Sequence, residues 1–199
     1  MANRNSAGFG FRQSGTLGNT PANQGLSQYW IDSAASVDLF NGMAMKSTGG
    51  YMITGESADT VTTIGVLYGI YYNAASTNKP TWAHWYDATI TPANSEDTQA
   101  FVNDYPFQKY TIASDTAVAA NVPAAHVKFM ETFSVNANTG GSTSTGRSTT
   151  SLEIATTHAT THSWRLLRSA EETENSDLTA AYCSLEVVQN LSEFVGSGT

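Results

Sequence analysis

Short apolar runs alternate with turn residues along most of the chain. The runs are rich in β-branched and aromatic residues, and Gly, Asn, Asp and Pro separate them. This pattern is typical of strands joined by turns and predicts about ten short strands. The expected strand segments are 29–31, 37–40, 43–46, 51–53, 61–72, 81–90, 100–102, 107–112, 126–135, 152–154, 164–167 and 182–190. We therefore expect an all-β fold, either a barrel-like or a sandwich domain.

Glycine marks the predicted turns and irregularities between these runs. Asn41-Gly42 is a strong hairpin-turn signal, and Gly49-Gly50 predicts a second turn. Gly65 and Gly69 interrupt the longest apolar run, where glycine often marks a bulge or a close approach of two backbones. Residues 169–178 predict an acidic loop, or a short helix that begins with a capping pattern.

The first 27 residues differ from the rest of the chain. They contain five glycines and show no apolar periodicity apart from Phe9 and Phe11. We interpret residues 1–27 as an extended Gly-rich N-terminal arm, and residues 28–199 as a β-rich domain with a flexible loop near 136–151. The two phenylalanines imply that the arm is ordered against something, either its own domain or a partner.

Charge is scarce in this chain. Only 13% of its residues are charged, and 48 of the 199 are Ser or Thr. The net charge of −8 disfavours nucleic acid, because phosphates need Lys and Arg for affinity. The single cysteine excludes an intramolecular disulfide. No apolar stretch is long enough for a membrane helix, and the first residues lack a signal-peptide core, so we expect no membrane association.

Three groups of residues resemble catalytic or metal-binding motifs. His158 and His162 lie four apart, which in a strand separates them by about 13 Å, too far for one metal ion. Cys183 has no activating neighbour in the sequence and reads as a small core residue. The acidic residues are expected to form a solvated loop; they are Glu171, Glu172, Glu174 and Asp177. We expect no cofactor, no metal and no enzymatic activity.

Trp82, Trp85 and Tyr86 form the densest aromatic group in the sequence. Aromatic faces can stack on sugars, so these residues could form a carbohydrate platform. Aromatic residues also dominate cores and subunit interfaces, and we favour a core or interface role here.

Several segments follow one another in a characteristic order along most of the chain. They are Gly10-Phe11-Arg12 with Gly15-Thr16-Leu17-Gly18, 40–45, 64–69, 100–107, 145–148 followed by 164–167, and 185–190. Together these segments resemble a group of tailed-phage structural proteins found among capsid decoration (cement) proteins. Gln13 stands where that group often has proline, and Met43 where it usually has an acid.

The resemblance implies a β-rich domain bound in many copies to the outer surface of a phage capsid. The expected partners are the major capsid protein and copies of the chain itself, as a trimer or dimer. We expect the arm to contact the capsid through Phe9, Phe11, Arg12 and Leu17. The expected location is the outer capsid surface of the virion, after synthesis in the host cytoplasm. The alternatives are another virion component, such as a tail, connector or fibre-base subunit, and a carbohydrate-binding β-sandwich.

Overall fold

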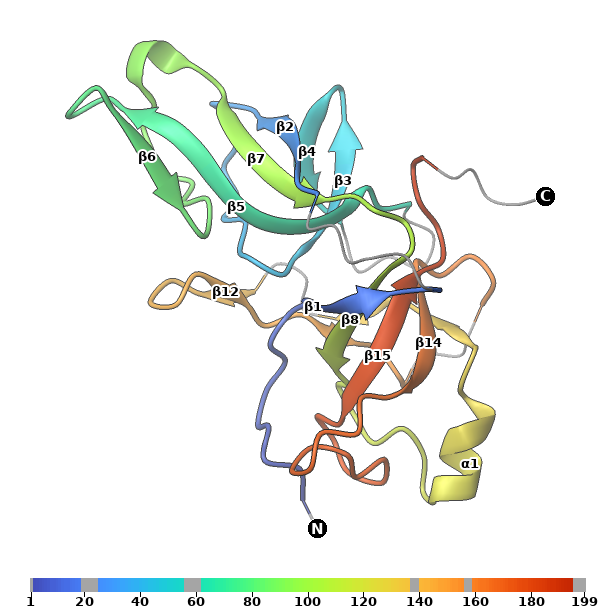
Figure 1. Ribbon diagram of the computed structural model, residues 1–199. Coiled ribbons are helices and arrows are strands. Elements are labelled where there is room, and N and C mark those ends of the chain that lie inside the picture. Colours follow the sequence, from blue (N-terminus) through green and yellow to red (C-terminus); the bar gives the residue numbers. More distant parts are fainter. Residues whose placement is uncertain (1, 19–24, 56–61, 137–139, 156–158, 195–199) are drawn as a thin grey trace.

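The computed structural model describes residues 2–18, 25–55, 62–136, 140–155 and 159–194 (Figure 1). Strands dominate these residues, which also contain one short α-helix and one 3₁₀ turn. The predicted all-β class is therefore confirmed. The described residues form 15 strands, more than the roughly ten expected, because several pairings are only two residues long. In Figure 1 the strands form two bodies, one above the other.

The upper body is a small barrel with one additional strand. Its strands pair in the order β3-β4-β2-β7-β5-β6, and β3 also pairs with β5. This last pairing closes five strands into a ring, and β6 extends the sheet beyond β5. The strands are β2 (Ser27–Ile31), β3 (Ala44–Thr48), β4 (Tyr51–Thr54), β5 (Gly65–Ala74), β6 (Lys79–Ala83) and β7 (Thr98–Asn103).

Alternation along these strands fills the barrel with apolar side chains. Met45, Met52, Ile70 and Val102 are all buried in one cluster inside it. The turn between β3 and β4 falls at Gly49-Gly50, as predicted, and both glycines have positive φ, 60° and 91°. Two positive φ angles suit the tight turns that match the twist of a hairpin.

The lower body is a five-stranded sheet with two short strand pairs beside it. The sheet has the order β1-β8-β15-β14-β9, and the pairs are β10 with β13 and β11 with β12. The sheet strands are β1 (Arg12–Thr16), β8 (Gln108–Ala113), β9 (Thr132–Phe133), β14 (Trp164–Ser169) and β15 (Ser184–Gln189). The short pairs consist of β10 (Val135–Asn136), β11 (Gly141–Ser142), β12 (Arg147–Ser148) and β13 (Ser151–Leu152).

Trp164 is at the centre of the lower core. Its side chain is fully buried, and its ring lies 4.1 Å from the ring of Phe11 and 5.7 Å from that of Tyr110. Phe11 and Tyr110 also meet edge to face, 5.6 Å apart. Three aromatic rings from three distant segments therefore hold this core together.

The N-terminal segment packs on its own domain, which was the first of the two alternatives. Residues 12–16 form β1 and pair with β8, so the segment is part of the sheet. The side-chain amide of Asn3 donates to the backbone carbonyls of Asp177, Ala180 and Ala181. Burial of Phe11 explains why the segment does not extend away from the domain.

Several predicted strands are wrong in extent. The segment 37–40 belongs to no strand and contributes only a single bridge, between Leu39 and Tyr86. Most of 126–135 is not a strand, because helix α1 (Val122–Val127) includes its first two residues and pairing is limited to Thr132–Phe133 in β9 and Val135 in β10. The side chain of Asn121 caps this helix by accepting a hydrogen bond from Ala124 N at 3.0 Å. The predicted strand 81–90 ends at Ala83, after which the chain turns. The helix alternative for 169–178 is also wrong, since these residues form β14's last position and turns.

The expected loop near 136–151 is partly structured. Of its described residues, 141–142 and 147–148 pair as a short hairpin, and residue 136 pairs with 151. The strand prediction for 182–190 is confirmed by β15.

Glu186 on β15 is a buried carboxylate between two cations. Arg168 Nε donates to its Oε2 at 2.8 Å, and Lys109 Nζ lies 3.5 Å from its Oε1. Burial alone would raise the pKa of Glu186. The hydrogen bond from Arg168 and the charge of Lys109 outweigh burial and lower the pKa below the ordinary value of 4.5.

This arrangement predicts acid sensitivity. The stability that Glu186 provides is expected to be fully present above pH 4.5 and to be lost as the pH falls through the lower folded-state pKa. Glu186→Gln should flatten the pH dependence of the free energy of unfolding, measured by urea denaturation from about pH 3 to about pH 7. Glu174→Gln, at an exposed carboxylate, is the matched control. An unchanged acid profile in Glu186→Gln would refute this role.

Candidate functional site

Five outward-facing side chains form one row across the outside of the barrel. Strand register places Trp30 opposite both Tyr51 and Gln99, and Tyr71 opposite both Gln99 and Trp82. Residues directly opposite on neighbouring strands point to the same face of a sheet. The row therefore runs Tyr51, Trp30, Gln99, Tyr71, Trp82 and spans about 19 Å at about 4.8 Å per strand.

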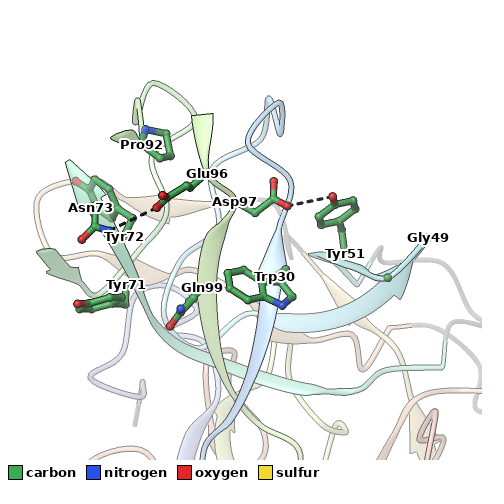
Figure 2. A pocket seen from close by; sticks show the side chains of 11 residues that line it. Trp30, Gly49, Tyr51, Tyr71, Tyr72, Asn73, Pro92, Glu96, Asp97 and Gln99 are labelled. Atoms are coloured by element: carbon green, nitrogen blue, oxygen red, sulfur yellow. Dashed lines mark hydrogen bonds between the residues drawn. The ribbon is translucent and has the colours of Figure 1, made fainter. Parts of the chain in front are cut away.

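Most of this row forms the floor of a groove on the barrel surface. Figure 2 shows Trp30, Gln99 and Tyr71 side by side on three adjacent strands, with Tyr51 at one end. The groove has a volume of about 500 Å³. Gly49-Gly50 and the segment 92–97, which contains the 3₁₀ turn η1 (Ala93–Ser95), also line it.

Two carboxylates line the groove above this floor. Asp97 accepts hydrogen bonds from Tyr51 Oη at 3.1 Å and from Ser33 N at 3.0 Å. Glu96 is exposed and accepts from Asn73 Nδ2 at 3.5 Å. The hydrogen bond to Asp97 raises the pKa of the Tyr51 phenol, so this hydroxyl stays a donor. No Lys, Arg or His is among the described residues that line the groove.

Trp82 continues the row beyond the groove. Its ring lies 4.9 Å from that of Phe101 and 6.4 Å from that of Tyr68. A Cβ at Gly69 would come within 2.6 Å of the Trp82 ring, so the glycine makes room for it. The register of β5 against β7 shifts between Leu67 and Gly69, which confirms the predicted bulge.

The aromatic group predicted from the sequence does not stay together. Trp82 is 44% exposed and joins the row, whereas Tyr86 is fully buried in the barrel core. Trp85 is partly buried and stacks on Phe40, with ring centroids 5.1 Å apart. The three residues therefore cannot form one platform, because the strand ends at Ala83 and Tyr86 lies in the barrel core.

The four expected capsid-contact residues also have different environments. Phe11 is buried in the lower core and cannot reach a partner, so the expectation that Phe11 contacts the capsid is wrong for the folded chain. Phe9 is half-buried, and the guanidinium of Arg12 lies 3.9 Å from its ring centre. Leu17 is exposed, and its N–H donates to the carbonyl of the exposed Phe107 at 2.9 Å.

The histidines and the cysteine that were considered as metal-binding or catalytic residues make structural contacts instead. Cys183 is buried, and burial raises the pKa of its thiol to about 11, which disfavours the nucleophilic thiolate. His162 is buried, with Nδ1 3.1 Å from the carbonyl oxygen of Thr132, and His158 lies outside the described residues.

The acidic residues are similarly tied to their neighbours. Glu174 pairs with Arg4, and Glu172 accepts a hydrogen bond from the Ser184 hydroxyl at 2.6 Å. Hydrogen bonds from Thr179 lower the pKa of Asp177 to about 2. Across the described parts of the chain, no three His, Cys, Asp or Glu side chains gather closely enough to hold a metal ion.

Sequence reasoning missed most of the row. Trp30, Tyr51, Tyr71 and Gln99 come from four separate strands, and only the pairing register brings them together. The one local signal was alternation, since each of these residues flanks a position that points into the barrel. Chemically, the row combines flat aromatic faces with amide and carboxylate groups, which suits reversible binding of a polar ligand.

Comparison of the chain with protein-family models, with curated proteins and with solved structures finds no match. Among the described residues, no helix has the length and apolar character needed to cross a membrane.

Proposed function

We propose that the protein is a structural component of a tailed-phage particle that binds the outer surface of the capsid. In this role it bridges neighbouring capsid subunits as a decoration protein. Its partners are the major capsid protein and further copies of itself, as a trimer or dimer. Support comes from the ordered series of segments that resemble this group, and from where the fold exposes apolar side chains.

The observation that carries the proposal is the presence of two separate apolar surfaces on the lower body. The first, the Leu17 patch, consists of Leu17 and Phe107, the latter 52% exposed. The second, the α1 patch, consists of Val122, Val127 and Met130, of which Val127 is 74% exposed. Figure 1 shows α1 at the lower end of the molecule, below the sheet to which β1 belongs. A bridging protein needs two such contact surfaces, whereas a module for one ligand needs only one.

The low charge of the chain supports the same proposal. Burying an ion without a partner costs far more than burying a hydrogen-bonded hydroxyl. Only 13% of the residues are charged, so neighbouring subunits on a lattice can cover much of the surface without burying charged side chains that lack a partner. Many weak contacts repeated on one lattice then give strong retention.

Co-sedimentation with capsids that lack this protein tests the proposal. The wild-type chain is expected to pellet with the capsids and to saturate at a fixed ratio. The variants Leu17→Asp/Phe107→Asp and Val122→Asp/Val127→Asp should each weaken retention at least about tenfold, because each places charge in a contact surface. Ser76→Asp/Thr77→Asp adds the same two charges in an exposed turn of the barrel and is the matched control.

Failure of the wild-type chain to pellet with such capsids would overturn the proposal. Equal retention of both double variants and the control would show that neither apolar patch is a contact surface. Circular dichroism of each variant verifies that a loss of binding is not a loss of fold.

A further inference from the structure

We propose that the groove over β4, β2, β7 and β5 binds a neutral polysaccharide chain. The groove is on the outside of the barrel, whereas the Leu17 and α1 patches belong to the lower body. The inference rests on the geometry of the groove alone and does not depend on attachment to a capsid.

The aromatic spacing suits a sugar chain. Trp30 and Tyr71 are on strands that flank β7, so they are two strand spacings apart, about 10 Å. This is close to the length of a disaccharide unit in an extended polysaccharide. Trp30 is 49% exposed, which leaves a ring face free to stack on the apolar face of a pyranose. Gln99 lies between the two rings and offers both an amide donor and an amide acceptor.

The polar wall supplies the hydrogen bonds that sugar hydroxyls need. Asp97 and Glu96 accept hydrogen bonds, and the Asn73 amide provides both donor and acceptor groups (Figure 2). Asp97 is already held in place by Ser33 N and Tyr51 Oη. Little ordering is therefore required of it when a ligand binds, and this preorganisation favours affinity.

The charge of the groove selects among possible occupants. Its described lining has two carboxylates and no cationic side chain, so it repels uronate and sulfate groups. A protein surface that covered both carboxylates would need cations to compensate their burial. The hydroxyls of a neutral sugar can donate to these carboxylates while leaving them partly hydrated. A neutral polysaccharide is therefore the occupant that the groove fits best.

Affinity electrophoresis of the isolated full chain tests this inference. Gels contain a soluble β-glucan, xylan or mannan as the neutral probes, and alginate as the acidic probe. At least one neutral polysaccharide should retard the wild-type protein, and alginate should not. Trp30→Ala and Tyr71→Ala should weaken the retardation at least about tenfold, because each removes one stacking face. Trp30→Phe keeps a flat ring and should restore part of it.

Phe107→Ala is the matched control, since Phe107 is about as exposed as Trp30 but lies in the Leu17 patch. It should bind as the wild type does. Absence of retardation by every neutral polysaccharide would overturn the inference, and so would unchanged binding in Trp30→Ala. Light scattering measures the oligomeric mass and tests whether the groove is instead an interface between copies of the chain. If Trp30→Ala reduces the oligomeric mass and no glycan binds, the groove is an interface between copies and the glycan inference is wrong.

Discussion

Phe11→Ala is expected to lower the free energy of unfolding by about 3–5 kcal/mol, the usual cost of truncating a buried phenylalanine. Phe11 is 4% exposed, and its ring packs on both Trp164 and Tyr110. Loss of the ring leaves a cavity beside Tyr110 and Trp164. Urea denaturation followed by tryptophan fluorescence measures the change.

Leu17→Ala is the matched control for this prediction. Leu17 belongs to the same N-terminal segment but is 38% exposed, so its truncation should change stability by no more than about 0.5 kcal/mol. Deletion of residues 1–17 should go further than Phe11→Ala, because it also removes β1 from the edge of the lower sheet. A truncated chain that keeps wild-type stability would show that the segment is a dispensable arm.

Gly65→Val is expected to destabilise the barrel by about 3 kcal/mol, at the upper end of the usual cost of overpacking. Gly65 pairs with Met45 where β5 meets β3 and closes the barrel. A Cβ at Gly65 would overlap the backbone carbonyl of Asn103 on the neighbouring strand. Valine has a high strand propensity, so any loss of stability reports the overlap rather than the local backbone preference.

Tyr68→Val introduces the same residue three positions along the same strand and serves as the control. Tyr68 is 44% exposed, so this change should stay within about 1 kcal/mol. Thermal unfolding monitored by circular dichroism compares the two variants. A Gly65→Val protein as stable as Tyr68→Val would show that β5 and β7 can separate without cost.

The existence of most strands could be predicted from the sequence, because alternation and turn residues are local signals. Gly49-Gly50 and the bulge at Gly69 follow from glycine's conformational freedom and small size. Helix α1 was missed because the apolar residues that follow it in 126–135 resemble a strand. Asn121 and Pro123, a cap and a residue suited to the first turn of a helix, were the local signal that could have identified it.

The candidate site could not be predicted, because it depends on strand register. Trp30, Gln99 and Tyr71 are far apart in the chain, and a shift of one residue in either pairing would move a side chain of the row to the inside of the barrel. Burial of Phe11 had a similar cause. A Gly-rich segment with two phenylalanines has the same sequence pattern whether it packs on another protein or on its own sheet. The packing of Phe11 against Trp164, which the sequence does not reveal, shows that the segment packs on its own sheet.

An image of the intact phage particle at side-chain resolution tests the central proposal most directly. The proposal predicts the barrel and the lower sheet on the outer face of the capsid, at every equivalent lattice position, with the Leu17 and α1 patches in contact with neighbouring subunits. Absence of the chain from the capsid surface, or its presence at a single vertex only, would contradict the decoration role.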